Sequence, residues 1–385
     1  MKQVLILTAD YGYGHRSAAN AIAEALCERP DRVGTVEVVN PLDDPRAPAF
    51  LREGQEDYDR LVREMPDLYK FGYQVSERPL AGNLLNGTWT LALLNVLRDI
   101  IRQRQPDVIA TTYPFYQGIL DAVFATEKRR IPLVTVVTDL ATVSRLWFHP
   151  AADWCLVPTQ TVYDLALEAG LPAEKLRITG IPVRPELAKG TTRPAALRQK
   201  LGWSPDLFTV LAIGSKRVEH LYDSLRVLNH SGLPLQLVTV TGGDQALFQR
   251  CRETQWHVET HVYDFVSEMG TFLRAADCVM SKAGGLTTSE ALACGLPMIL
   301  VDVIPGQETG NAQHVVSADA GELARDPIEV LEAMCHWLER DRARFIQQAA
   351  NARRLGHPRA AYDVAECILA AGAPQQTRDN SETPG

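Results

Sequence analysis

The run V-L-I-L-T-A-D-Y-G-Y-G-H-R-S-A-A-N-A-I-A-E-A-L, from Val4 to Leu26, joins two regular patterns through a pair of glycines. The short apolar segment from Val4 to Leu7 predicts a buried strand. A helical stripe follows, formed by Ala18, Ala19, Ile22, Ala23 and Leu26. Gly12 and Gly14 predict a turn between them in which the backbone can approach a ligand. Strand, glycine turn and helix in this order are typical of a doubly wound α/β domain.

The same alternation of short β-branched runs and helical patterns continues along the 385 residues. We predict strands at residues 4–7, 35–39, 108–111, 133–138, 154–157 and 176–178, and then at 208–213, 235–240, 258–262, 278–280 and 298–301. Strands that alternate with helices form parallel sheets with crossover helices. Two such series predict an α/β protein with two doubly wound, Rossmann-like domains.

The domain junction is predicted where a run rich in proline, glycine and charge begins at Gly180. We therefore place one domain at 1–185 and a second at 186–370. The segment 371–385 lacks large apolar residues and is predicted to be disordered. A helical insert is predicted at about 50–105, with one apolar face formed by Trp89, Leu93, Val96, Leu97, Ile100 and Ile101. That face either packs on the core, which we favour, or contacts lipid.

Composition excludes some functions. The net charge is -8 and neither half is basic, so bulk attraction to nucleic acid is not expected. No apolar run approaches the roughly 20 residues that span a bilayer, and the first apolar run is too short for a signal peptide. The seven cysteines show no paired spacing, which favours a reducing compartment. We expect a cytoplasmic protein whose contact with a membrane is peripheral.

His15 is the residue of the first glycine turn that known nucleotide motifs do not explain. The pattern G-x-G-x-x-S has Ser17 where a dinucleotide site has its third glycine, and Asn40 stands where the ribose-binding acid would be. A lone histidine is usually structural. At the carboxyl edge of a sheet, however, an imidazole that titrates near neutrality is a good candidate for a general base.

A second glycine turn occurs in S-K-A-G-G-L-T-T-S-E, from Ser281 to Glu290. It follows a predicted strand and precedes a helix predicted to begin at about Thr287, capped by Thr287 and Thr288. Bare amides at Gly284 and Gly285, together with the helix dipole, suit a diphosphate. A carboxylate one turn further into the helix can accept both hydroxyls of a ribose. A polar loop with Gln307 and Glu308 follows, which suits the adjacent hydroxyls of a hexose.

These motifs resemble the monogalactosyldiacylglycerol synthase and processive diacylglycerol glucosyltransferase family, and more distantly the lipid-linked N-acetylglucosaminyltransferase of peptidoglycan synthesis. The matching runs are G-Y-G-H-R-S-A, V-V-T-D-L-A-T-V-S-R-L-W-F-H-P, V-P-T, S-K-A-G-G-L-T-T-S-E and P-G-Q-E-T-G-N. They occur in order over roughly residues 3–365, whereas the helical insert matches only loosely.

The resemblance implies a GT-B fold, in which the two domains face a central cleft, and an inverting, metal-independent transfer of sugar from a UDP donor without a cofactor. His15 would be the base, in the acceptor loop with Gly12 and Gly14. Asp139, at the end of the V-V-T-D strand, could orient His15 or share its role, or it could simply cap the strand end. The donor would be held by Gly284, Gly285, Leu286, Thr287, Thr288, Glu290, Gln307 and Glu308, with uracil at the backbone of Val266.

The sequence departs from the family at one turn. Members commonly carry several glycines after the first strand of the second domain, whereas this chain has A-I-G-S-K-R-V-E, with Gly214 alone. Ser215 and the ammonium of Lys216 could replace amide contacts to phosphate there, or Lys216 could simply be exposed.

The predicted function is transfer of a hexose from UDP-glucose or UDP-galactose to a lipid hydroxyl at a membrane surface, most simply that of diacylglycerol. The inner face of the cell membrane is the location expected for such an enzyme. Three alternatives stay open from sequence: a different acceptor, a UDP-sugar 2-epimerase on the same fold, and a sugar-nucleotide-binding protein without turnover.

Overall fold

The computed structural model describes residues 1–11, 13–47, 49, 51–52, 88–190, 192–215, 218, 220–303 and 307–371, with the backbone alone at 13, 88–90 and 307. Three predictions therefore lie wholly or mainly outside the described residues. They are the placement of Gly12, most of the helical insert at about 50–105, and the disordered tail.

The first domain contains a parallel sheet of six strands with the order β2-β1-β3-β4-β5-β6. Its strands, all predicted from the sequence, are β1 (Lys2–Leu7), β2 (Val33–Val39), β3 (Val108–Thr111), β4 (Leu133–Val136), β5 (Trp154–Val157) and β6 (Leu176–Ile178). The inner strands β1, β3, β4 and β5 are mostly buried, whereas the edge strands β2 and β6 are largely exposed or half-buried. The strand order reverses at β1, which has β2 on one side and β3 on the other. Ligands bind at such a switch point in open α/β sheets, and helix α1 (Tyr13–Cys27) starts there.

The second domain repeats this arrangement with the order β12-β11-β10-β7-β8-β9, again all parallel. Its strands are β7 (Phe208–Ile213), β8 (Leu235–Val240), β9 (Glu259–Tyr263), β10 (Cys278–Ser281), β11 (Met298–Leu300) and β12 (Gly321–Leu323). The switch point lies between β7 and β10. Sequence analysis missed β12, because a three-residue G-E-L run with one large apolar side chain gives no strand pattern.

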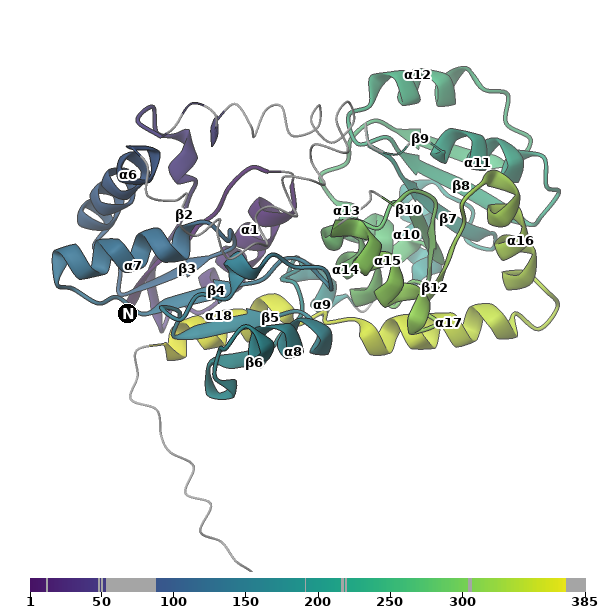
Figure 1. The fold of residues 1–385 in the computed structure, drawn as a ribbon. Helices are drawn as coiled ribbons and strands as arrows, with labels where there is room; N and C mark the ends of the chain where they lie inside the picture. Colours follow the sequence, from purple (N-terminus) through teal and green to yellow (C-terminus); the bar gives the residue numbers. More distant parts are fainter. Residues whose placement is uncertain are drawn as a thin grey trace, which may run out of the picture.

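Helices cover both sheets (Figure 1). The first domain has α1, α6 (Thr88–Arg104), α7 (Tyr116–Glu127) and α8 (Gln160–Glu168). The second has α9 (Glu186–Lys189) at the junction, followed by α10 (Pro194–Leu201), α11 (Leu221–Asn229), α12 (Gln245–Glu253), α13 (Met269–Ala275), α14 (Gly285–Ala293), α15 (Gln307–Ser317), α16 (Pro327–Trp337) and α17 (Ala343–Leu355). Short 3-10 turns lie at Pro41–Asp43, Arg145–Trp147 and Ala173–Lys175.

The apolar face predicted for the helical insert packs on the core. Leu93, Val96, Leu97 and Ile101 of α6 are each at most 5% exposed and join the same cluster as α7. The core-facing interpretation is therefore confirmed for the described part of this helix, and these four side chains cannot contact lipid.

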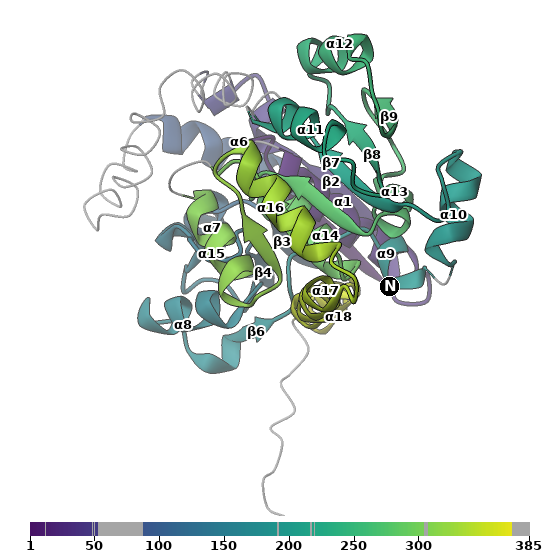
Figure 2. The same cartoon turned by 90° about the vertical axis from the view of Figure 1, so that its right-hand side faces the viewer.

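The last helix, α18 (Ala360–Ala370), returns to the first domain. Its buried residues join the core formed by β1, β3 and α1. Figure 1 shows α17 and α18 in succession along the base of the molecule, and Figure 2 views them nearly end-on. The predicted division assigns this helix to residues 186–370, whereas its packing places it on the first sheet.

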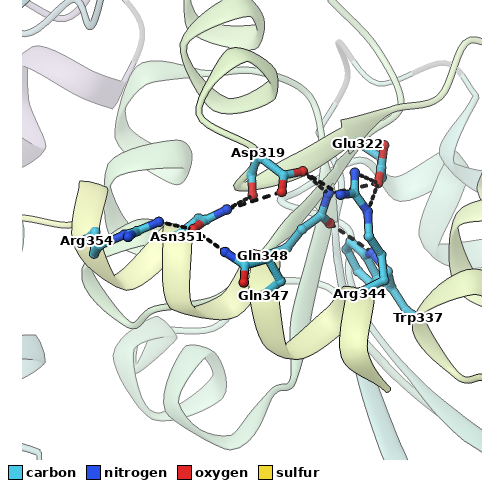
Figure 3. Close-up of polar contacts among 8 residues, drawn as sticks. All are labelled: Asp319, Glu322, Trp337, Arg344, Gln347, Gln348, Asn351 and Arg354. Atoms are coloured by element: carbon cyan, nitrogen blue, oxygen red, sulfur yellow. Dashed lines mark hydrogen bonds and ion pairs between the residues drawn. The ribbon is translucent and has the colours of Figure 1, made fainter. Parts of the chain in front are cut away.

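A polar network fixes α17 to the second domain before the chain crosses back (Figure 3). Gln348 accepts a hydrogen bond from Trp337 Nε1 at 2.9 Å and donates to Asp319 Oδ1 at 3.1 Å. Asn351 Nδ2 donates to the Asp319 carbonyl at 2.7 Å, and Arg344 pairs with Glu322 of β12 at 2.9 Å. These contacts bind α17 to the turn that leads into β12.

The two segments that cross between the domains meet at one carboxylate. Glu28, just after α1, accepts a hydrogen bond from Lys189 Nζ of α9 at 2.6 Å. Tyr362 of α18 donates to the same carboxylate at 3.0 Å. The outgoing linker and the returning helix are thereby joined to the end of α1.

Candidate active site

His15 lies in the first turn of α1, at the switch point of the first sheet. The helix begins at Tyr13, so Gly14 and His15 belong to the helix rather than to a turn before it, and that detail of the prediction is wrong. The imidazole Nδ1 shares a hydrogen bond with Thr138 Oγ1 at 2.8 Å. Its ring packs edge-on against Tyr113, with centroids 5.3 Å apart, and obliquely against Trp147 at 6.1 Å.

Burial lowers the pKa of His15 below its ordinary value of 6.5, and the nearby charges of Asp139 and Asp10 partly oppose this effect, as does a hydrogen bond with the Thr112 backbone. The imidazole is therefore neutral near pH 7 and able to take up a proton. The same two carboxylates would stabilise the imidazolium that results. This combination suits a general base.

Asp139 follows strand β4, as predicted, and is 8% exposed. Its Oδ2 accepts a hydrogen bond from Trp147 Nε1 at 3.1 Å. Sequence analysis missed Thr138 and Trp147 as neighbours of His15. Their signal was present, because both lie within the V-V-T-D-L-A-T-V-S-R-L-W run, but only the fold brings that run to α1.

Charged residues lie beside His15 at the same sheet edge. Arg16 donates to both carboxylate oxygens of Asp10, at 2.8 and 2.7 Å, and this guanidinium lowers the pKa of Asp10. Asn40 donates to Asp10 at 3.3 Å and to Asp43 at 2.7 Å. The asparagine that weakened the dinucleotide interpretation is thus part of the network that holds Asp10 in place.

The second glycine turn leads directly into helix α14. The helix begins at Gly285 with Gly284 as its N-cap, and no side chain caps it. Thr287 and Thr288 therefore lie inside the first turn, and the prediction that they cap the helix is wrong. The bare amides of Gly284, Gly285 and Leu286 remain suited to an anion. Thr288 is fully buried.

Helix α15 starts at Gln307, so Gln307 and Glu308 lie in its first turn instead of in a loop, which corrects the prediction. The side chain of Gln307 is outside the described residues. Glu308 is 6% exposed and forms an ion pair with Lys282 of the glycine turn. The carboxylate predicted to bind sugar therefore lies at the same sheet edge as the amides predicted to bind diphosphate.

The two sheet edges face each other at close range. A Cβ at Gly285 would lie 3.2 Å from the carbonyl oxygen of Thr138. A Cβ at Gly310 of α15 would overlap the Thr142 side chain and lie 2.8 Å from the Thr142 amide nitrogen. The start of α14 is thus adjacent to the residue whose hydroxyl bonds His15.

Glu290 lies on α14 near the interdomain junction. Burial and the charge of Glu186 raise its pKa to about 7, which Arg184 opposes. A carboxylate in this position is partly protonated at neutral pH. Contact with an arginine or with ligand hydroxyls would favour its ionised form.

Close packing explains why residue 214 is a glycine. A Cβ at Gly214 would lie 2.7 Å from Leu247 Cδ2, and the Gly214 carbonyl approaches Gly242 so closely that a side chain at 242 would contact it at 2.5 Å. Gly242 and Gly243 both have positive φ, of 63° and 82°. A glycine-rich turn therefore exists at this edge, but it follows β8 and not β7, the strand after which family members commonly carry it.

Ser215 follows Gly214 at the same edge, whereas Lys216 is outside the described residues. Val266 is partly buried after β9 and packs against the core of the second domain. Beside it Phe265 is 74% exposed. The predicted donor residues that the structure describes thus lie at the carboxyl edge of the second sheet or in the helices that start there.

The structure has two parallel sheets that face each other, and at the switch point of each sheet a helix begins where α/β proteins bind ligands. This arrangement defines the GT-B class of fold. Solved structures share it. MurG from Acinetobacter baumannii aligns over 96% of this chain and 99% of its own, with a TM-score of 0.61 and 15% identity. UDP-GlcNAc 2-epimerase from Neisseria meningitidis, bound to UDP-GlcNAc, aligns over 96% and 100%, with a TM-score of 0.61 and 16% identity. These similarities establish the fold alone.

Sequence comparison establishes the family. Residues 15–183 match the monogalactosyldiacylglycerol (MGDG) synthase model, and 214–361 match the glycosyltransferase family 28 C-terminal domain. A probable MGDG synthase 2, chloroplastic, of Oryza sativa subsp. japonica is 31% identical over 95% of this chain and 80% of its own length. MGDG synthase 3, chloroplastic, of Arabidopsis thaliana is 30% identical over 98% and 83%.

The chain belongs to the MGDG synthase family. It is a glycosyltransferase of glycolipid synthesis, so the predicted enzyme class, a hexosyltransferase, is confirmed.

The predicted location is wrong. The relatives are named as chloroplastic proteins, which contradicts a cytoplasmic protein at the inner face of the cell membrane. Within the described residues, no helix is both long and apolar enough to cross a bilayer.

Proposed function

We propose that this protein transfers galactose from UDP-galactose to the free hydroxyl of diacylglycerol, with inversion at the anomeric carbon. One observation carries the proposal: the start of α14 lies against Thr138, whose hydroxyl bonds His15. A helix start suited to a diphosphate and a residue suited to be a base are thus neighbours across the two domains. The names of the relatives support galactose over glucose and diacylglycerol as the acceptor.

In the proposed reaction, His15 takes the proton of the acceptor hydroxyl while the oxygen attacks the anomeric carbon. The new C–O bond forms on the face opposite UDP, and the bond to the diphosphate oxygen breaks with its electron pair leaving on UDP. An α-linked donor therefore gives a β-linked product. Asp139 and Asp10 stabilise the positive charge that develops on the imidazole.

The donor side of the proposal uses the second sheet. Amides at Gly284 to Thr287 hold the diphosphate beside the buried Thr288 side chain. The positive end of the α14 dipole stabilises the charge of the diphosphate as it leaves, without a metal. Glu290 holds the ribose, and the backbone at Val266 meets uracil. Gln307 and Glu308 bind the sugar hydroxyls. Gly214 and Ser215 approach the phosphates from the neighbouring strand end.

The acceptor side uses the first sheet edge, where α1 begins and Gly14 lies in its first turn. Aromatic rings cluster there: Tyr113 stacks on Tyr11 with centroids 5.6 Å apart and contacts Phe115 at 5.4 Å. Phe115 is 38% exposed. This surface suits a glycerolipid presented by a bilayer.

The test measures UDP release from UDP-galactose, UDP-glucose and UDP-GlcNAc, with and without vesicles that contain diacylglycerol. We expect release only with diacylglycerol and fastest with UDP-galactose, and a β-glycoside by NMR of the extracted lipid. Activity should persist in chelator. An α-linked product excludes inversion.

Three other outcomes would contradict the proposal. Epimerised donor without release of UDP indicates a 2-epimerase, and UDP binding without any turnover indicates a binding protein. Equal rates on vesicles that lack diacylglycerol, but contain another hydroxyl-bearing lipid, indicate a different acceptor.

A further inference from the structure

Lys282 lies in the glycine turn between β10 and α14, in a position that the reaction proposed above does not use. Its side chain is 18% exposed, and its ammonium forms an ion pair with the buried carboxylate of Glu308. A Cβ built at Gly284 would lie 2.9 Å from Lys282 Nζ. The ammonium therefore lies beside Gly284, the N-cap of α14.

This location is electrostatically unusual for a lysine. The start of a helix carries partial positive charge, so it favours anions and disfavours cations. Removing an ammonium and a carboxylate from water also costs free energy that their mutual attraction offsets only with good geometry. Glu308 neutralises one charge, but the amides of α14 and the Lys282 ammonium together still favour a further anion at this turn.

Helix α15 contacts the same turn at a second position. Asn311, three residues after Glu308, donates through Nδ2 to the carbonyl of Ala283 at 2.9 Å. Asn311 is 1% exposed and Thr288 is fully buried. Neither Asn311 Oδ1 nor Thr288 Oγ1 has a hydrogen-bond partner in the described part of the chain. Buried polar atoms are normally satisfied, so these two atoms beside the turn indicate a polar ligand.

We propose that Lys282 binds the donor diphosphate and, with the same ammonium, positions the Glu308 carboxylate for the sugar. An ammonium has three N–H donors, so one can hold Glu308 while the others face phosphate oxygens. The contact with Lys282 fixes the orientation of the Glu308 carboxylate, so that it can accept hydrogen bonds from sugar hydroxyls. Lys282 thereby couples recognition of the diphosphate to recognition of the sugar. This inference rests on the proposed UDP-sugar site.

The test compares UDP with UMP, which lacks the second phosphate, by calorimetry on the full-length protein. Wild type should bind UDP more tightly than UMP. Lys282→Met should weaken UDP binding about tenfold to a hundredfold, as expected for loss of a hydrogen bond to a charged group, and UMP binding much less. Lys282→Arg, which keeps the charge, should retain part of the preference. Glu308→Gln should keep the preference for UDP over UMP but raise KM for the UDP-sugar.

A structural role would give a different result, because a misfolded turn would weaken UDP and UMP equally. If Lys282→Met is unstable, the double variant Lys282→Met/Glu308→Gln removes both members of the buried pair and should restore the melting temperature. That variant should still show a smaller preference for UDP over UMP than the wild type does. A Lys282→Met protein with the wild-type preference for UDP overturns this inference alone. Wild-type protein that binds neither nucleotide overturns the proposed donor site and the inference with it.

Discussion

At the residue scale, two opposing effects set the pKa of His15. Burial favours the neutral imidazole, whereas Asp139 and Asp10 favour the charged form. The net effect is a pKa below the ordinary 6.5, so the base form persists into mildly acidic solution. A residue with these properties and a hydrogen bond to Thr138 is well placed to take a proton and to hold it only briefly.

We expect His15→Ala to lower kcat by about 10²–10⁴, the usual contribution of a general base. UDP affinity should stay unchanged, because the donor contacts lie on the other sheet. The wild-type kcat should hold constant down to a pH below histidine's ordinary 6.5 and then fall, since the pKa of His15 is lowered. Steady-state kinetics and calorimetry measure both quantities. Normal turnover in the alanine variant would refute the assignment.

Glu290 should make the affinity for the donor depend on pH, because its pKa is raised whereas that of His15 is lowered. Its pKa is raised to about 7, so the carboxylate ionises only as the pH rises through neutrality. We expect the affinity for UDP-galactose, measured without acceptor, to increase over this range, because an ionised carboxylate accepts both ribose hydroxyls. Glu290→Gln should flatten the increase. An identical pH profile in the glutamine variant would exclude Glu290 from the donor site.

The stability of the folded protein should decrease with rising pH, whereas the affinity for the donor increases. The folded protein holds the Glu290 proton more tightly than the unfolded chain, whose glutamate has the ordinary value of 4.5. The free energy of unfolding should therefore decrease between about pH 4.5 and 7 relative to Glu290→Gln, as urea titrations of the two proteins would measure. Equal pH slopes would show that Glu290 is not desolvated.

Some of these residue-level features could be predicted from the sequence and others could not. His15, Asp139 and the turn at Gly284 were recognisable because glycine, histidine and a strand end occur together within a few residues. The contacts of Thr138 with His15 and of Lys282 with Glu308 were not, because each joins distant segments. Local pattern carries no information on which sheet edges will face each other.

At the scale of elements, the two helices that begin at the cleft both present glycine to the first domain. Gly285 of α14 faces Thr138, and Gly310 of α15 faces Thr142. Because neither has a side chain, the two domains can approach to backbone contact at these positions. The first turns of α14 and α15 are thus both candidate ligand-binding sites and contact surfaces between the domains.

Gly310→Ala should therefore impair closure of the domains. A Cβ there would overlap Thr142, so we expect kcat to fall by about tenfold, while UDP still binds to the second domain. Gly118→Ala in α7 is the matched control, since its Cβ would meet only His149 at an ordinary 3.6 Å. Both changes raise helix propensity by about 1 kcal/mol, but in Gly310→Ala the overlap with Thr142 opposes that gain, so a cooperative melting transition in both variants is the check that they fold. Unchanged kcat in Gly310→Ala would mean that closure does not require this contact.

Element boundaries were less predictable than element types. The buried strands are apolar runs, and the sequence predicts all but β12. Helices α1, α14 and α15 begin earlier than expected or where a loop was expected, because they start at or beside glycine rather than at a capping Ser, Thr, Asp or Asn. Glycine signals a turn in sequence, and only the backbone conformation shows that the helix has already begun.

At the scale of the whole molecule, the last helix, α18, packs into the core of the first domain, although the second domain separates the two in sequence. Ile368 is fully buried in the core of the first domain. We expect Ile368→Ala to cost about 2–5 kcal/mol, as for other buried isoleucines. Ile346→Ala on α17, where the side chain is 59% exposed, is the matched control and should cost less than about 0.5 kcal/mol.

Urea unfolding measures the two costs, and hydrogen exchange locates them. In Ile368→Ala the amides of β1 and β3 should exchange faster, whereas those of β7 and β8 should not. Faster exchange confined to the second sheet would show that α18 belongs energetically to the domain that its sequence position suggests. The crossing itself was not predictable, because an amphipathic helix does not specify in its own sequence which sheet it will cover.

The polypeptide passes between the domains twice, once near Gly180 and again between α17 and α18. Both connections are bound to Glu28 at the end of α1, so they hold the two domains together on that side of the molecule. The cleft should consequently open and close by a hinge motion about this side, with the larger movement on the side away from Glu28. The His15 edge would then meet the Gly285 edge in the same alignment at every turnover, with no orientational search.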